Sequence, residues 1–157
     1  MSAIAIKNMT KTYPKTGHRA LIDITFKVRN GEIFGLVGPD GAGKTSLLRI
    51  LATTLLPDEG TVLLHDVDTV QNYQKIREMI GYMPGRFSLY SDLTVAENLS
   101  FFATLYGVKV RENYHLIGDI YSQLEPFRHR RAGKLSGGMK QKLALCCALI
   151  HRPRILL

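Results

Sequence analysis

The chain has 157 residues, 45% hydrophobic and 22% charged, which is the composition of an ordinary globular protein of about one domain. Its formal net charge is +8, but the basic residues are scattered apart from 128–131, so nucleic acid is not predicted as a partner. That cluster is interpreted as a solvated loop, with a partner- or membrane-facing surface as the alternative. The longest apolar runs are far shorter than the roughly 20 residues of a membrane span, and the first ten residues do not resemble a secretory signal. We therefore expect a cytoplasmic protein.

Alternation of apolar and polar residues predicts half-exposed strands over 3–9 and 21–28, followed by a turn at Asn30-Gly31. The short apolar run over 33–37 precedes a group of glycines, which predicts a strand buried on both faces of a parallel sheet. From Thr45 the apolar residues follow helical spacing. Further along, we predict strands over 61–64, 80–83 and 155–157, and helices over 72–79, 94–106, 111–124 and 136–150.

Two local features refine these predictions. Thr94 and Glu97 have the spacing of a capping box at a helix start, and Gly107 is a suitable stop for the same helix. Cys146 and Cys147 are adjacent and surrounded by leucines, so buried structural thiols are expected rather than a disulfide. The histidines are expected to be exposed or to cap helices; they are His18, His65, His115, His129 and His151.

A glycine-rich stretch fits the pattern GxxxxGK[ST] between a predicted buried strand and a predicted helix. Its glycines allow backbone N–H groups to turn inward, and the following helix N-terminus favours an anion. The stretch therefore predicts a site for nucleoside triphosphate. Lys44 would reach the β- and γ-phosphates, Thr45 would ligate Mg²⁺, and Ser46 would add a phosphate contact. The predicted site comprises Gly38, Pro39, Asp40, Gly41, Ala42, Gly43, Lys44, Thr45 and Ser46.

A second glycine motif opens the predicted helix over 136–150. Ser136 is a suitable N-cap, so a capped helix after a loop is one interpretation. Capping does not account for the two glycines that follow, which would permit close approach of a phosphate to the helix start. The residues favour this second interpretation and leave the first one open.

Together the two motifs resemble the nucleotide-binding domain of ABC transporters, with Leu135, Ser136, Gly137, Gly138 and Gln141 matching its LSGGxxQ signature. Further similarities lie at Tyr13, at Gly31-Glu32, at 81–84 and at 93–99, and the residues around the loops are most similar to ABC-2-type exporter cassettes. The resemblance covers essentially the whole chain. It implies an α/β fold of the P-loop NTPase class, with N-terminal β strands, a parallel core sheet and a helical signature subdomain.

The resemblance also implies ligands and partners. Tyr13 would stack on adenine, and ATP with Mg²⁺ would lie between two cassettes, so the signature residues would act on the nucleotide of the partner cassette. The chain would form a homodimer or heterodimer and would join a membrane-spanning transporter subunit. It would thus be peripheral on the inner face of the cell membrane.

Two departures from the family affect the expected chemistry. Gly85 stands where the family has a glutamine that touches Mg²⁺ and the attacking water and couples the site to the membrane subunit. In the family, the strand beginning at 155–157 continues to an aspartate and a glutamate, and a later histidine senses the γ-phosphate. The resemblance therefore assigns no catalytic residue to this chain, which is expected to be cut off from a longer cassette and to hydrolyse little or no ATP alone.

We predict an incomplete ABC domain in which 1–84 is the nucleotide-binding part, 85–150 holds the glutamine-loop region and helical subdomain, and 151–157 begins a truncated Walker B strand. The favoured function is the ATP-binding subunit of an ABC transporter that couples ATP binding and hydrolysis to transport, in the direction of export. The first alternative is a degenerate cassette that binds ATP without hydrolysing it and completes a partner's site. The second is a soluble ABC protein that acts on ribosomes or DNA.

Overall fold

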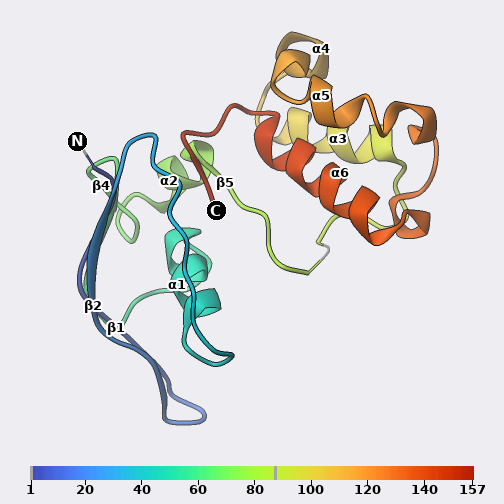
Figure 1. Ribbon diagram of the computed structural model, residues 1–157. Coiled ribbons are helices and arrows are strands. Elements are labelled where there is room, and N and C mark those ends of the chain that lie inside the picture. Colours follow the sequence, from blue (N-terminus) through green and yellow to red (C-terminus); the bar gives the residue numbers. More distant parts are fainter. Residues whose placement is uncertain (1, 87) are drawn as a thin grey trace. The chain divides into compact units, whose positions relative to one another are not determined.

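The computed structural model describes residues 2–86 and 88–157 and divides into two compact units, Met1–Met79 and Ile80–Leu157 (Figure 1). Buried apolar side chains are present in both units. The sequence predicts a functional division after residue 84, and that division remains a prediction.

The first unit is built on a four-stranded antiparallel sheet with the strand order β2-β1-β3-β4. β1 (Ser2–Tyr13) and β2 (His18–Arg29) form a long hairpin, β3 (Glu59–Leu64) pairs with β1, and β4 (Val67–Asp68) adds a short edge. The strands predicted over 3–9, 21–28 and 61–64 are thus confirmed, and each is longer than its apolar pattern indicated.

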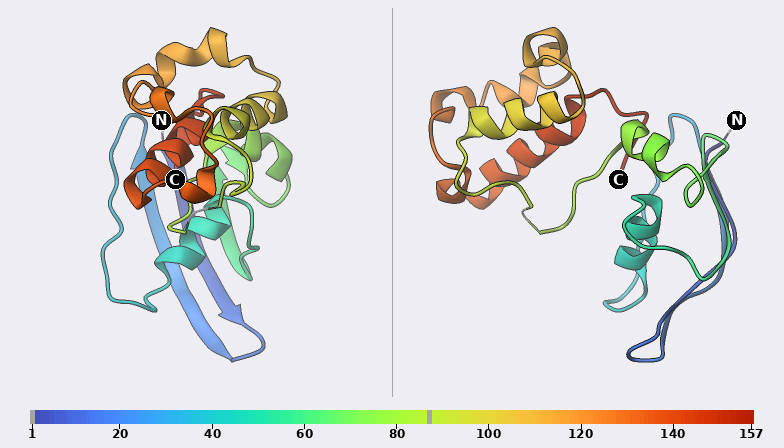
Figure 2. Two further views of the ribbon diagram at one scale, coloured as in Figure 1. Left: turned by 90° about the vertical axis from the view of Figure 1, so that its right-hand side faces the viewer. Right: turned by 180° about the vertical axis from the view of Figure 1, so that it is seen from behind.

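Two helices lie on the same side of this sheet, α1 (Lys44–Leu51) and α2 (Tyr73–Met79) (Figures 1 and 2). Helical spacing places the apolar residues of α1 on one face, and this face is buried. The buried apolar side chains of the strands and helices include Ile4, Ile6, Met9, Leu21, Leu47, Ile50, Leu51, Val62, Leu64 and Ile76. Their burial fixes α1 relative to β1 and β2, and so positions the loop that precedes α1.

The strand predicted over 33–37 is wrong for the described residues, because this segment pairs with no strand there. Ile33 and Val37 are 100% exposed, and Phe34 stacks on Phe26 with ring centroids 5.1 Å apart. An apolar run is buried in a parallel sheet only when neighbouring strands pair with it and helices cover it. The segment is apolar as predicted, but no described strand pairs with it.

The second unit is largely helical. α3 (Val95–Leu105) and α6 (Gly137–Leu149) pack together, and α5 (Gly118–Tyr121) packs against α6 (Figure 2). α4 (Val110–Asn113) and 3₁₀ turns at Tyr114–Leu116, Glu125–Phe127 and Ala132–Lys134 complete the helical part. Its core comprises Val95, Leu99, Ala103, Ile117, Tyr121, Leu124, Ala132, Leu135, Leu143, Cys146, Cys147 and Ile150.

The capping box is confirmed, since Thr94 Oγ1 accepts from Glu97 N at 3.2 Å and Glu97 Oε2 accepts from Thr94 N at 2.8 Å. The single helix predicted over 111–124 is wrong, because it is broken around Ile117 and Gly118. Ile117 has φ −125° and is buried, and Asn113 Nδ2 donates to Ile150 O at 2.7 Å. These tertiary contacts, together with the low helix propensity of glycine, outweigh the local periodicity.

Two short strands of the second unit, β5 (Ile80–Gly81) and β6 (Ile155–Leu156), pair in parallel. The hydrogen bonding between the two segments continues beyond these strands, since Leu157 O accepts from Met83 N at 2.9 Å. Of the strand predicted over 80–83, only Ile80–Gly81 is a strand, but Met83 is still bonded to the neighbouring segment. A Cβ added at Gly81 would lie 2.5 Å from Ala148 O, which makes glycine necessary there.

The two cysteines are buried in the helical core, as predicted. Burial raises the pKa of the Cys146 thiol to about 12, and burial also raises the pKa of Cys147. Both thiols are therefore protonated and unreactive at neutral pH, and they act as apolar packing groups.

Candidate functional site

The glycine-rich loop before α1 lines a concavity of about 230 Å³ in the first unit. Its lining contains Tyr13 and the loop from Asp40 to Ser46, all of which the sequence predicts, together with His18 and Ala20, which it does not. The volume is below the roughly 300–1,000 Å³ of sites that enclose drug-sized ligands. The concavity therefore encloses only part of a nucleotide-sized molecule.

Gly43 is the residue of this loop that the fold most strictly requires. It has φ 86°, a left-handed conformation that side chains with a Cβ disfavour. An added Cβ would also lie 2.2 Å from Ala20 O and 2.8 Å from Leu21 Cδ2. The loop therefore packs directly against β2, and only a glycine permits this approach.

Lys44 places its positive charge at the loop. Its Nζ donates to Gly38 O and to Pro39 O, both at 2.7 Å. The N-terminus of α1 begins at the same residue, so the helix dipole and the ammonium group both favour an anion there. Gly38 and Pro39 contact Lys44 through these carbonyl groups, although they do not line the concavity.

Tyr13 lies at the edge of the same concavity, with its hydroxyl 3.0 Å from Ser46 Oγ. Ser46 is buried in α1 at 8% exposure, so this contact ties the end of β1 to the helix that follows the loop. Tyr13 itself is half-buried. The structure thus brings together two residues that are 33 positions apart and that the sequence assigned to one nucleotide.

An ion pair that the sequence did not predict joins β1 to the residue before β3. Lys11 Nζ lies 2.5 Å from Asp58 Oδ1, and Thr12 N donates to Asp58 Oδ2 at 2.6 Å. The hydrogen bond from Lys11 lowers the pKa of Asp58, and the bond from Thr12 lowers it further. The two residues are 47 positions apart in the sequence, and their contact depends on the register of the strands. The residue types alone therefore do not predict the pair.

The second glycine motif begins α6. Ser136 is its N-cap, with Oγ accepting from Met139 N at 3.4 Å, so the capping interpretation is confirmed. Leu135 is buried, whereas Gly137, Gly138 and Gln141 are exposed. A Cβ added at either glycine would meet no atom within 4 Å, and neither has positive φ. Within the described residues, therefore, no packing or backbone conformation requires these two glycines.

Gly85, the residue at the family's glutamine position, is exposed. An added Cβ there would also meet nothing within 4 Å. The backbone around Gly85 can therefore accept a larger side chain without a clash.

The histidine prediction is confirmed for His18, His115 and His129, which are exposed, and it is wrong for His65 and His151, which are half-buried. The ring of His151 stacks on Tyr106 at 3.7 Å between centroids, and its Nε2 lies 3.0 Å from Ile80 O. Burial lowers the pKa of His151, and the contact with Ile80 opposes this shift. His151 therefore joins the end of α3, the end of α6 and β5.

Among residues 2–86 and 88–157, no helix has the length and apolar character needed to cross a membrane. Over the same residues, no three His, Cys, Asp or Glu side chains are grouped so that they could hold a metal ion.

A glycine-rich loop that leads into a helix and ends in Lys44 and Thr45 defines the class of phosphate-loop nucleotide-binding proteins. Residues 21–157 match the family described as ABC transporter, and the chain is a member of that family. The family resemblance found in the sequence is thus confirmed, as is the α/β fold class of the ABC type.

Two curated relatives illustrate the match. The chain is 41% identical over 158 residues to the probable multidrug ABC transporter ATP-binding protein YbhF of Escherichia coli K12, covering 99% of this chain and 27% of that protein. It is 37% identical over 142 residues to the ABC transporter ATP-binding protein NatA of Bacillus subtilis, covering 88% of this chain and 58% of that protein. The chain thus spans less than two thirds of the length of these relatives.

Solved structures show the same fold. A structure of the ATP binding subunit of an ABC transporter matches with a TM-score of 0.87 and 27% identity, covering 99% of this chain and 65% of that one. The dimeric bacterial ABC transporter cassette MJ0796 matches with a TM-score of 0.84 and 28% identity, covering 98% and 72%. The same cassette has also been solved in a post-hydrolysis state bound to ADP and Pi.

Proposed function

We propose that this chain forms the ATP-binding part of an ABC transporter, which couples ATP binding and hydrolysis to transport in the direction of export. The observation that carries the proposal is the loop before α1, where Gly43 packs on β2 and Lys44 lies over the loop carbonyls. Relatives named for multidrug transport, doxorubicin resistance and Nod factor export support the direction.

The residues that bind ATP are Tyr13 and the loop from Gly38 to Ser46. The backbone N–H groups at the start of α1 hold the phosphates, and Lys44 exchanges its bonds to the loop carbonyls for the β- and γ-phosphates. The 230 Å³ concavity is filled by the phosphate chain, so adenine lies outside it against the ring of Tyr13. The contact between Tyr13 and Ser46 keeps that ring beside the loop.

Mg²⁺ fits this site through the Thr45 hydroxyl and the nucleotide's own phosphates, since protein-bound Mg²⁺ commonly takes few side-chain ligands. When bound, Mg²⁺ neutralises charge on the phosphates. Thr45 is exposed at the start of α1, where its hydroxyl can reach a metal ion beside the loop.

The signature residues at the start of α6 serve a second cassette. Gly137 and Gly138 are open to approach from outside the chain, and the N-cap at Ser136 leaves a helix start at which a phosphate can dock. The dimeric form of the similar cassette MJ0796 supports an assembly of two cassettes. A membrane-spanning subunit completes the transporter and holds the chain at the inner face of the cell membrane.

Lys44→Ala tests the proposed binding site in the natural full-length protein, with Lys75→Ala as the control. Lys75 is exposed on α2 in the same unit, so both changes remove one lysine charge. We expect Lys44→Ala to weaken Mg-ATP binding by a factor of 100 or so, as measured by calorimetry, because charged hydrogen bonds to phosphate are lost. Unchanged affinity in Lys44→Ala would remove the loop from the site.

A second candidate function is a cassette that binds ATP without hydrolysing it, which Gly85 favours because it supplies no side chain at the family's glutamine position. Gly85→Gln distinguishes the two, since the backbone there accepts a side chain without a clash. If Gly85 suppresses hydrolysis, the glutamine variant turns over ATP at least about tenfold faster in the assembled transporter, with ATP affinity unchanged. Equal turnover in both proteins would count against this candidate.

A further inference from the structure

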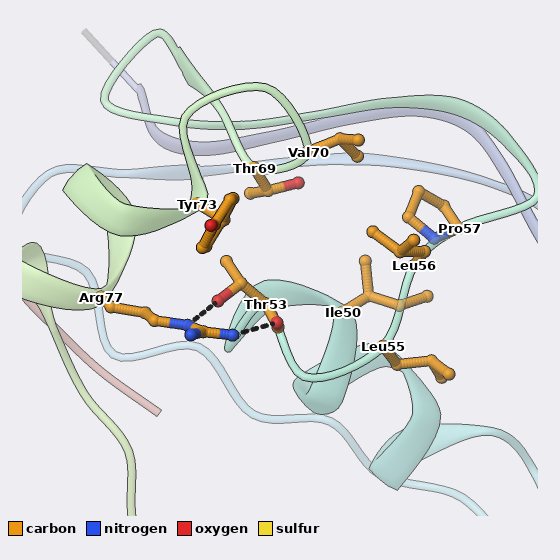
Figure 3. A pocket seen from close by; sticks show the side chains of 9 residues that line it. All are labelled: Ile50, Thr53, Leu55, Leu56, Pro57, Thr69, Val70, Tyr73 and Arg77. Carbon is orange, nitrogen blue, oxygen red and sulfur yellow. Dashed lines mark hydrogen bonds between the residues drawn. The ribbon is translucent and has the colours of Figure 1, made fainter.

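A second cavity of the first unit lies at the end of α1 opposite the phosphate loop (Figure 3). Its volume is about 210 Å³. It is lined by Ile50 of α1, by the segment that follows this helix, by the segment between β4 and α2, and by α2 itself. The lining residues are Ile50, Thr53, Leu55, Leu56, Pro57, Thr69, Val70, Tyr73 and Arg77.

Three apolar side chains at the mouth of this cavity are exposed to water. Leu56 is 62% exposed, Val70 45% and Tyr73 43%, and all three border the same opening. Covering a cluster of exposed apolar side chains lowers the free energy of the system. Such clusters mark ligand-binding or interaction sites.

Thr69 supplies a polar group that lacks a partner. Its residue is 2% exposed, and its Oγ1 is buried without a hydrogen bond from any described residue. Figure 3 shows this oxygen between Tyr73 and Val70 at the edge of the cavity. A buried hydroxyl without a partner costs free energy, but Thr69 Oγ1 has almost no surface that a ligand atom could reach, so the group that binds a ligand lies elsewhere in the lining.

Arg77 supplies a positive charge that is already fixed in position. Its Nε donates to Thr53 Oγ1 at 2.9 Å and its Nη2 to Thr53 O at 3.1 Å, while its Cζ lies 5.1 Å from the ring centroid of Tyr73. A guanidinium group has five N–H donors, and two of its nitrogens are used here. No carboxylate is among the nine lining residues, so the charge of Arg77 is open to an anionic ligand.

We propose that this cavity binds a small carboxylate with an apolar body, such as a short aliphatic or aromatic acid. The carboxylate group bonds to Arg77, and the body covers the exposed side chains of Leu56 and Val70 beside the buried Ile50. Because 210 Å³ is below the volume of drug-sized pockets, the ligand is smaller than a drug. A bare phosphate is disfavoured, because it would leave the apolar walls uncovered. The site goes beyond the proposed function and requires no nucleotide.

The test is methyl NMR on the natural full-length protein without nucleotide. Hexanoate and phenylacetate are titrated, with hexan-1-ol and 2-phenylethanol as uncharged analogues and inorganic phosphate as an anion without an apolar body. We expect saturable shifts of the Ile50, Leu56 and Val70 methyl signals, with the carboxylates binding at least about tenfold more tightly than the alcohols. Phosphate is expected to leave these signals unchanged.

Variants separate this site from general effects. Val70→Trp fills the cavity from an exposed position and is expected to abolish the carboxylate-dependent shifts. Ile22→Trp, at another exposed apolar position, on β2, is expected to leave them intact. Arg77→Gln is expected to weaken carboxylate binding about tenfold while leaving the alcohols unaffected. Because Arg77 also bonds Thr53, the folding of the Arg77→Gln variant is checked by circular dichroism.

Three results would overturn the proposal. They are the absence of saturable shifts at millimolar carboxylate, equal binding of carboxylates and alcohols, and unchanged carboxylate binding in Val70→Trp. Each is distinguishable from failure of the proposed function, since ATP binding at the opposite end of α1 is measured separately.

Discussion

The two glycine motifs of this protein have the same residue type for opposite reasons. Gly43, before α1, has a left-handed backbone, and its Cα faces the main chain of β2 so closely that no Cβ fits. Gly137 and Gly138, at the start of α6, have ordinary backbone angles and open space around them. The fold of the chain requires the first glycine and does not require the other two.

This difference shows that packing within the chain requires glycine in the first motif but not in the second. The loop before α1 is shaped by packing within its own unit, so the concavity beside it is formed by a single chain. The glycines at the start of α6 bring no gain in packing among the described residues, and glycine has a lower helix propensity than alanine. Their role is therefore to be sought in what approaches from outside.

The largest effect is expected from Gly43→Ala. We expect it to lower the free energy of unfolding by about 3 kcal/mol or more, because the added Cβ combines a disfavoured φ with an overlap at Ala20 O. Urea denaturation measures this, with Gly41→Ala as the control. Gly41 also has positive φ, at 82°, but has free space for a Cβ. If the two variants are equally stable, packing on β2 does not explain the need for Gly43.

Asp58→Asn is expected to lower the free energy of unfolding by about 1–3 kcal/mol, because Lys11 is nearly buried and loses its charged partner. The pKa of Asp58 is lowered in the folded protein, so its contribution is present above the ordinary value of 3.8 and is lost as pH falls through the folded value. Denaturation at neutral and at acidic pH measures both effects.

Glu59→Gln is the control for Asp58→Asn, since Glu59 is exposed and its bond to Thr10 Oγ1 is long at 3.4 Å. A loss of stability as large in this variant would show that the ion pair has no special part in holding β1. The strands around the phosphate loop would then contribute less to its stability than the contrast with α6 implies.

Gly137→Ala and Gly138→Ala are expected to leave the free energy of unfolding unchanged or to raise it by up to about 1 kcal/mol. Binding of Mg-ATP to the chain's own loop should be unaffected, whereas ATP turnover in the assembled transporter should fall. Denaturation, calorimetry and a phosphate-release assay measure the three quantities. A destabilisation by either alanine would break the contrast between the motifs.

The smallest effect concerns His151. Its pKa is lowered by burial in the folded protein, so the unfolded chain binds a proton more readily and stability declines as pH falls below the ordinary value of 6.5. His151→Phe keeps an aromatic ring against Tyr106 and should flatten the dependence of unfolding free energy between about pH 7.5 and 5.5. His115→Phe, at an exposed histidine, should leave that dependence as it is.

The features that were predicted correctly are those that depend on neighbours in the sequence. The capping box at Thr94 and Glu97 and the N-cap at Ser136 each join groups three residues apart, so the residue types alone indicated them. The break at Ile117 was missed because a tertiary bond from Asn113 to Ile150 outweighs local helical spacing. The cavity beside Arg77 was also missed, since it forms between segments that share no motif.

The sequence by itself determined the phosphate loop, the signature and the family, because these are short patterns whose chemistry requires fixed spacing. Only the tertiary structure decided which glycines the fold requires, because that depends on Ala20 O lying beside Gly43 and on nothing lying beside Gly137. It also decided that Ile33 and Val37 are exposed, and that Lys11 pairs with Asp58. Contacts between distant residues follow from packing and strand register, and a linear pattern does not contain them.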